Sequence, residues 1–277
     1  MKKLTAIALI LMLALSLVAC GGSNDTASDS GKPVLRVAME CAYAPYNWAQ
    51  ASDANGAVPI VDSVDYAYGY DVMMAKYLAD YMGYDLEIYQ IEWDALPMAL
   101  QAGTVDCVIA GQSITAERLQ TVDFTDPYYY ASIYAVTLAD SAYANATTVA
   151  ELEGATCTSQ INTIWYTDCI PQIPNANILP AIESAPAMFV ALESGKCDLV
   201  VTDEPAALGA LAVYSDMVML DLTAGDFQVS DEIVNIGISV KKGNSDLLNK
   251  LNEGLATLTR EDFVSMMNEA IELSANL

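Results

Sequence analysis

The sequence predicts an α/β fold with two lobes, and three observations lead to this expectation. Apolar, strand-like runs alternate with segments of helical periodicity, and the alternation occurs twice along the chain. The chain has 277 residues, which is enough for one large core or two medium-sized ones. Polar residues follow several predicted strands directly, and in open α/β sheets ligands bind at such strand ends.

The start of the chain has the features of a secretory signal. Two lysines precede an apolar run over residues 6–18 that is too short to span a bilayer comfortably. The segment LVAC that follows looks like the lipobox of bacterial lipoproteins. The pattern predicts a signal peptide over residues 1–19, diacylation of Cys20 and a flexible polar tether over residues 20–32.

The charge balance excludes several partners. Acidic residues number 36 against 11 basic ones, for a net charge of −25. Phosphates would be repelled, so no nucleic-acid partner is expected, and attachment to an anionic membrane has to come from the acyl chains. The chain has no histidine and no CxxC pair, so we expect neither a zinc site nor another cofactor.

Five cysteines remain after Cys20, so at least one is unpaired. Cys107 and Cys197 lie in apolar, strand-like runs, which is typical of core residues. Cys157 and Cys169 flank a predicted strand-to-helix turn and are candidates for a disulfide.

The first half of the chain begins with a predicted strand over residues 34–39. A surface excursion with an Asn55-Gly56 turn follows over residues 50–67. An amphipathic helix is expected over residues 70–82, ended by Gly83. Next come a strand (86–91), a helix beginning at Trp93, a buried strand (105–110) and a helical turn (116–119).

The second half repeats the alternation. Its predicted elements are a helical turn (149–152), a strand (155–159), a helix opening at residues 160–163 and running toward Cys169, a helix (187–193), a strand ending at Asp203, a return strand (234–240) and a helix (245–258). Thr259 and Asp262 are expected to cap a last helix.

Residues 110–130, AGQSITAERLQTVDFTDPYYY, form the most distinctive stretch. Arg118 is one of three arginines, and its planar guanidinium suits a carboxylate bidentately. The stretch resembles the signature AGxTxTxERxxxVDFSxPY of the family 3 extracellular solute-binding proteins, the substrate receptors of polar amino-acid ABC transporters. Ser113 stands where threonine is commoner. Further similar segments extend the resemblance from about residue 34 to about residue 258.

The resemblance implies a set of site residues. The ligand's α-carboxylate would bind Arg118, the Ser113 hydroxyl and the backbone at Gly111, with further amides from Asn162 and Thr163 at a helix start. Asp203 would accept hydrogen bonds from the ligand's ammonium. The remaining pocket residues would be Glu40, Tyr43 and Trp93, with the two aromatic rings on opposite sides of the ligand.

The implied fold is the type II periplasmic-binding-protein architecture. Its first lobe would comprise residues 33–130 with 236–277, and its second lobe residues 131–235, with hinges near residues 130–134 and 231–236. Closure around the ligand would present a loaded receptor to ABC permease subunits, and no GxxxxGK[ST] motif for ATP is present. We expect a monomer, outside the cytoplasm and lipid-anchored to the outer face of a bacterial membrane.

Glutamate and aspartate are disfavoured as ligands, because no inferred site residue other than Arg118 is cationic. Polar uncharged, aromatic and cationic amino acids remain, and Glu40 favours a side chain that donates hydrogen bonds. One alternative is a dehydratase-like enzyme using Glu40 as a general acid beside Asp203, although without histidine no Ser-His or Cys-His pair can form. Another is a sensor or adhesin lipoprotein on the same fold.

Overall fold

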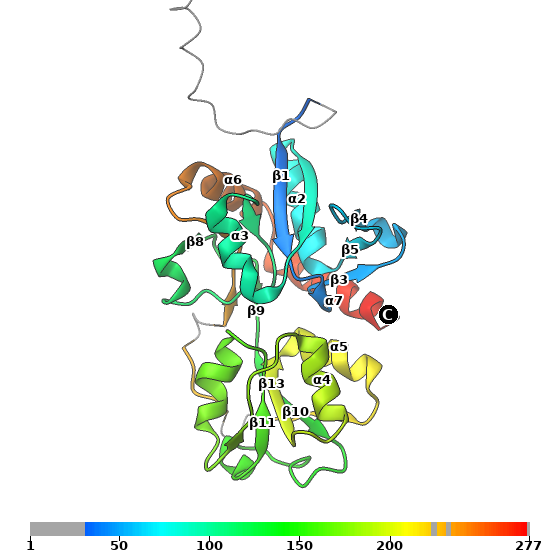
Figure 1. Cartoon of the computed structure of the whole chain (residues 1–277), viewed down its shortest axis with the longest axis vertical. Coiled ribbons are helices and arrows are strands. Elements are labelled where there is room, and N and C mark those ends of the chain that lie inside the picture. The colour runs from blue at the N-terminus through cyan, green and yellow to red at the C-terminus, as the bar shows by residue number, and fades with distance from the viewer. Residues whose placement is uncertain (1–30, 223–225, 231–233, 276–277) are drawn as a thin grey trace, which may run out of the picture.

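The computed structural model describes residues 31–222, 226–230 and 234–275, and it contains two five-stranded sheets, one in each lobe (Figure 1). The predicted signal peptide, Cys20 and most of the predicted tether lie outside the described residues. Among the helices of the described part, none has the length and apolar character needed to cross a bilayer.

The sheet of the first lobe has the strand order β6-β1-β7-β16-β8. Its strands are β1 (Val34–Met39), β6 (Asp85–Gln90), β7 (Cys107–Val108), β8 (Val122–Phe124) and β16 (Ser239–Lys241). Strand β1 pairs in parallel with both β6 and β7. The loops that follow β1 and β7 therefore leave the sheet at the same edge, which faces the second lobe (Figure 1).

Helices surround this sheet, and a small second sheet lies beside it. The helices are α2 (Tyr70–Met82), η2 (Trp93–Ala95), α3 (Leu96–Ala102), η3 (Arg118–Gln120), α6 (Ser245–Leu255) and α7 (Arg260–Ser274). The small sheet contains β2 (Ala42–Tyr43), β3 (Asn47–Gln50), β4 (Val58–Pro59) and β5 (Tyr66–Tyr68), with η1 (Ala54–Gly56) before β4.

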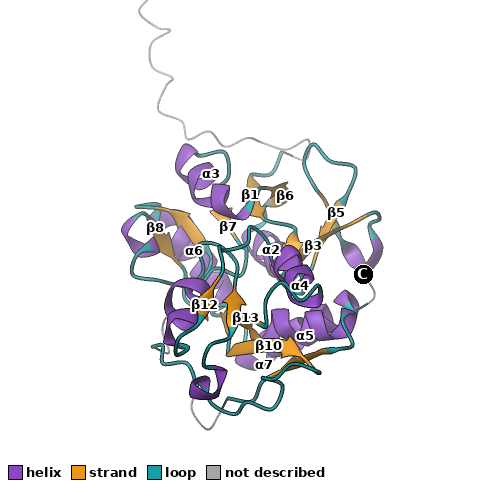
Figure 2. Ribbon diagram, turned by 60° about the horizontal axis from the view of Figure 1, so that its bottom comes forward, coloured by secondary structure: helices purple, strands orange, loops and turns teal. Residues whose placement is uncertain are grey.

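The sheet of the second lobe has the order β12-β11-β13-β10-β14. Its strands are β10 (Ile133–Leu138), β11 (Thr156–Thr158), β12 (Asn177–Ile178), β13 (Leu199–Asp203) and β14 (Met217–Met219). Helices α4 (Ala185–Glu193) and α5 (Glu204–Val213) lie together beside β10 and β13 (Figure 2). The turns η4 (Val149–Leu152), η5 (Trp165–Cys169) and η6 (Ile170–Gln172) contribute to a second apolar cluster in this lobe.

Two short antiparallel strands join the lobes. They are β9 (Tyr129–Tyr130) and β15 (Asn235–Ile236), and they pair at the place where both crossings were expected. Residues 231–233 of the second predicted hinge lie outside the described part. The predicted α/β architecture with two lobes is confirmed.

Several local predictions are also confirmed. Helix α2 has the expected bounds, and Gly83 ends it with a φ of 70°. Thr259 and Asp262 form a reciprocal capping box at the start of α7. Asn55 and Gly56 make the expected turn, with φ values of 60° and 80°.

Two predictions about segments are wrong. Residues 50–67 are not merely a surface excursion, because the segment completes the small sheet and buries Ala57, Ile60 and Ala67. The return strand over residues 234–240 is broken between β15 and β16. There the Gly237 N–H donates to the Gln112 carbonyl at 3.0 Å, and a Cβ on Gly237 would lie 2.8 Å from Ile114.

The suggested disulfide is also wrong. Cys157 and Cys169 are both free and buried in the core of the second lobe. Cys107 and Cys197 are buried core residues, as expected.

Candidate functional site

The predicted site lies where the two lobes face each other. A small cavity there is lined from the first lobe by Tyr43, Trp93, Gly111, Ser113 and Arg118, and from the second by Gln160, Thr163 and Trp165. It encloses about 10 Å³, about the space of one water molecule. A larger groove of about 560 Å³ adjoins it and shares Trp93, Arg118 and Thr163. The small cavity therefore has no room for a solute larger than water while the lobes stand as they do in this structure.

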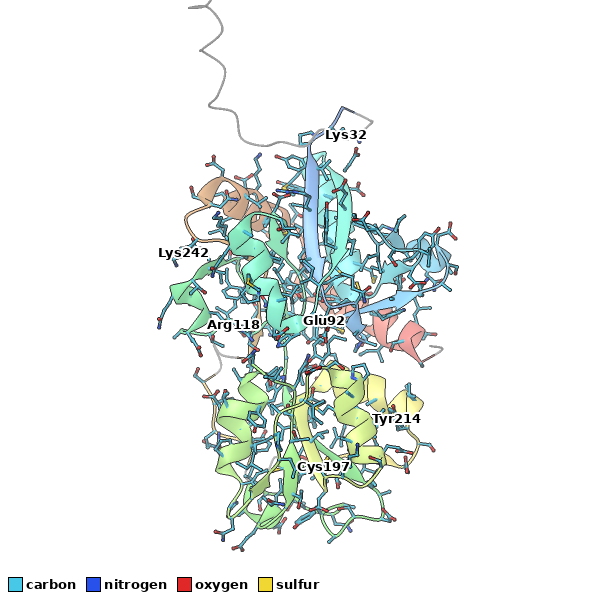
Figure 3. All side chains as sticks on the ribbon, viewed as in Figure 1. Lys32, Glu92, Arg118, Cys197, Tyr214 and Lys242 are labelled. Atoms are coloured by element: carbon cyan, nitrogen blue, oxygen red, sulfur yellow. The ribbon has the colours of Figure 1, made fainter. Side chains whose placement is uncertain are left out.

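Arg118 connects the two lobes at this cavity. It begins η3, the turn that follows the loop after β7, and Figure 3 shows it at the edge of the first lobe that faces the second. Its Nη1 donates to the Ser113 carbonyl at 2.7 Å and its Nη2 to the Asn162 carbonyl at 2.8 Å. The guanidinium carbon lies 5.5 Å from the centre of the Trp93 ring.

The guanidinium of Arg118 has only neutral partners in the described part of the chain. No described carboxylate forms an ion pair with it. Burial lowers the pKa of Arg118 to about 10, and nearby Glu117 opposes that shift. A partly buried cation whose direct contacts are two carbonyls and a ring has room for an anionic partner, which would neutralise its charge.

Trp93 contacts both lobes as well. Its indole Nε1 donates to the Ile161 carbonyl at 2.8 Å, and the side chain is buried. The ring thus forms one wall of the cavity and is held in place by a backbone group of the opposite lobe.

Glu40 lies just beyond the cavity, behind Gln160. The Gln160 Nε2 donates to both carboxylate oxygens, at 3.2 and 3.4 Å. Burial raises the pKa of Glu40 to about 7; the Gln160 hydrogen bond works against this rise and Glu92 adds to it. Glu40 is therefore a buried acid whose charge depends on what lies next to it at neutral pH.

Asp203 ends β13 and caps α5. Its Oδ1 accepts from the Ala206 N–H at 3.0 Å, and its Oδ2 accepts from the Tyr43 hydroxyl across the lobe interface. Burial raises the pKa of Asp203 to about 6, while the Tyr43 hydrogen bond lowers it. Asp203 does not line the cavity, but Tyr43 does, so Tyr43 stands between the two.

Gly111 and Ser113 form the loop after β7. Gly111 has a φ of 62°, and a Cβ there would lie 3.0 Å from the Tyr43 ring. Its N–H donates to the Tyr128 hydroxyl at 3.1 Å, so this group is directed away from the cavity. Ser113 is buried and lines the cavity.

Asn162 and Thr163 form the loop after β11 in the second lobe. Asn162 has a φ of 59°, in the left-handed region that glycine adopts most readily. Thr163 lines the cavity, and its hydroxyl donates to the Gln160 carbonyl at 2.7 Å. The loop therefore makes a left-handed turn at Asn162, although this residue is not a glycine.

Sequence reasoning missed two of the lining residues, Gln160 and Trp165. Gln160 follows β11 almost directly, so the rule of polar residues after strand ends could have found it. Trp165 is one of three tryptophans and begins η5, but nothing in its local pattern indicates a cleft.

A buried network behind the site was also missed. Asp71, in the first turn of α2, accepts from the Tyr128 hydroxyl at 2.6 Å and from Asn47 Nδ2 at 2.7 Å. Tyr128 in turn accepts from the Gly111 N–H, and Asn47 Oδ1 accepts from the Cys41 N–H at 2.7 Å. One buried carboxylate thus ties together the loops after β1 and β7.

Comparison with known proteins identifies the family. Residues 35–269 match bacterial extracellular solute-binding proteins, family 3. The arginine-binding extracellular protein of Bacillus subtilis (strain 168) is 32% identical over 59% of this chain and 58% of its own length. A probable histidine-binding protein of Neisseria gonorrhoeae is 29% identical over 92% of this chain and 90% of its own.

Solved structures agree. One is an amino acid ABC transporter substrate-binding protein from Streptococcus pneumoniae Canada MDR_19A bound to L-arginine. It has a TM-score of 0.74 and 27% identity, and the match covers 86% of this chain and 94% of that one. Since the family match extends over most of the sequence, the chain belongs to the bacterial extracellular solute-binding proteins, family 3.

Proposed function

We propose that this protein captures a free α-amino acid between its lobes and delivers it to the permease of an ABC importer, without converting it chemically. The observation that best supports this proposal is Arg118, a partly buried guanidinium at the lobe interface that forms no ion pair with a carboxylate of the described chain. The ligand's α-carboxylate would supply that partner in a bidentate contact, with the Ser113 hydroxyl, the loop at Gly111 and the start of the turn at Asn162 and Thr163 beside it.

The other end of the ligand would bind Asp203. A zwitterion has its two charges one carbon apart, and the proposed anchors have opposite charges and lie on opposite lobes. Binding both charges at once requires both lobes, so the ligand would shift the molecule toward its closed form.

The ligand's side chain would lie toward Glu40 and Gln160, between the Tyr43 and Trp93 rings. A side chain that donates hydrogen bonds or carries a positive charge suits this environment, and arginine- and histidine-binding relatives favour the same chemistry. Glutamate and aspartate would place a second negative charge beside Glu40.

The arrangement of the chain in the cell follows from the same proposal. The signal peptide (1–19) would direct export, and acylated Cys20 would hold a monomer on the outer face of the membrane. Residues 33–130 with 236–277 and residues 131–235 would move as lobes about the β9–β15 pair, since the closed cavity is too small for a solute.

Calorimetry on the chain without its signal peptide tests the proposal. L-arginine, L-histidine and L-glutamine are compared with L-glutamate, and we expect glutamate to bind at least about 100-fold more weakly than the best of the others. Arg118→Ala should weaken binding by about 100-fold, because it removes two charge-assisted hydrogen bonds.

Lys196→Ala is the matched control, since it removes an exposed cation of the second lobe that lines neither the cavity nor the groove, and it should bind like the wild type. Unchanged affinity in Arg118→Ala, or tightest binding of glutamate, would contradict the proposal.

A further inference from the structure

Two tyrosines converge on Asp203. Tyr43 and Tyr46 are stacked, with ring centres 5.0 Å apart and planes inclined by 13°. The Tyr43 hydroxyl donates to Asp203 Oδ2, which joins the first lobe to the second.

The Tyr46 hydroxyl is buried and forms no hydrogen bond within the described residues. It nevertheless lies close enough to Asp203 to lower the pKa of that carboxyl. Tyr70 and Tyr129 pack edge-on against the Tyr46 ring, with centres 6.3 and 6.2 Å away, so the ring is confined. A buried hydroxyl without a partner is costly, and its position beside a carboxylate indicates where it would find one.

Access to Asp203 is controlled by Tyr43. Oδ1 already caps α5, and Oδ2 already accepts from Tyr43. Tyr43 lines the cavity and Asp203 does not, so the Tyr43 hydroxyl lies between a ligand's ammonium in the cavity and the carboxylate.

We propose that the two tyrosines exchange at Asp203 during ligand binding. The ligand's ammonium displaces the Tyr43 hydroxyl from Oδ2, and the Tyr46 hydroxyl then donates to the carboxylate and holds it in place. Tyr43 is thus a competitor of the ligand, and Tyr46 is a positioning residue for the loaded state. This inference rests on the proposed amino-acid binding and deepens it.

Isosteric substitutions separate the two roles. Tyr46→Phe should weaken binding of L-arginine by about tenfold, because a hydrogen bond to a charged group is lost in the complex. Its thermal midpoint without ligand should be unchanged or higher, because an unpaired buried hydroxyl is gone. Tyr43→Phe should bind L-arginine at least as tightly as the wild type and unfold at a lower temperature without ligand. Tyr81→Phe, on the exposed side of α2, should match the wild type in both measurements.

A ligand without the α-amino group tests the coupling to the ammonium. 5-Guanidinopentanoate keeps the carboxylate and guanidinium of arginine, and the penalty of Tyr46→Phe should disappear with it. If Tyr46 had only a structural role, Tyr46→Phe would bind both ligands more weakly by the same factor, and this result would overturn the exchange. Binding of L-arginine by Tyr46→Phe that is as tight as in the wild type, or tighter, would also overturn it. If L-arginine does not bind the wild type, the same comparison is made with the amino acid that the wild type binds most tightly. Its partner is then the analogue of that amino acid without the α-amino group. Failure of every amino acid to bind the wild type would overturn the proposed function together with the exchange.

Discussion

Glu40 is a buried acid whose pKa lies near neutrality. Burial raises that pKa to about 7, and the main opposing contact is the neutral Gln160 amide. A cationic ligand side chain would favour the carboxylate form, so binding would release the proton that Glu40 holds at lower pH.

The affinity for a cationic amino acid should therefore rise with pH. For a group with a pKa of about 7 that is ionised in the complex, the dissociation constant of L-arginine should fall about tenfold from pH 6 to pH 8. Calorimetry across this range measures the effect.

Glu40→Gln serves as the control for this titration. It should bind more weakly and lose most of the pH dependence, keeping only a small slope near pH 6 from Asp203, whose pKa is about 6. A wild-type affinity that stays constant from pH 6 to pH 8 would refute the role given to Glu40.

At the scale of secondary-structure elements, helix α5 has two roles. It is capped by Asp203, the proposed ammonium acceptor, and it packs against the first lobe at Gly209. A Cβ on Gly209 would lie 3.3 Å from Pro45 Cδ and 3.4 Å from the Ala44 carbonyl oxygen. The small residue lets the helix approach the loop that carries Tyr43, so closure depends on its size.

A large side chain at this position should hold the lobes apart. Gly209→Leu should weaken ligand binding by about tenfold or more, because overpacking opposes only the closed form. Small-angle scattering at saturating ligand should give a larger radius of gyration than for the wild type. Ala212→Leu, at an exposed position of the same helix, should leave both quantities unchanged. A Gly209→Leu variant with the affinity and the radius of gyration of the wild type would contradict this prediction.

At the scale of the whole molecule, three buried carboxylates share an unusual pH response. Burial raises the pKa of Glu40 and Asp71 to about 7 and that of Asp203 to about 6. In the unfolded chain these groups ionise near pH 4, so between pH 4 and 7 the folded state binds more protons. Their contribution to stability is complete at the lower end of this range and is lost as pH rises.

The protein without ligand should therefore be more stable in mild acid than in mild base. We expect the thermal midpoint at pH 5.5 to exceed that at pH 8 by at least about 3 °C. Calorimetric scans in 0.5 M NaCl measure this while screening repulsion among the surface charges. Glu40→Gln should reduce the difference, and a midpoint that is higher at pH 8 would contradict the prediction.

Local pattern predicted much of the architecture, because short-range chemistry decides it. The bounds of α2, its glycine end, the capping box of α7 and the turn at Asn55 all depend on residues within a few positions of one another. The small sheet over residues 42–68 was missed because its strands are only two to four residues long and show no clear alternation.

The candidate site was likewise predictable only in part from the sequence. The strand ends and the stretch around Arg118 predicted which loops face the cleft, since parallel strands bring those loops to one edge. The sequence by itself thus determined the α/β class, the order of elements and the residue types at the strand ends. Only the tertiary structure decided that Tyr43 donates to Asp203, 160 positions away, that Gln160 covers Glu40, and that Asp71 links two loops. The physical reason is that such contacts depend on how two separately packed lobes approach each other, which no local periodicity encodes.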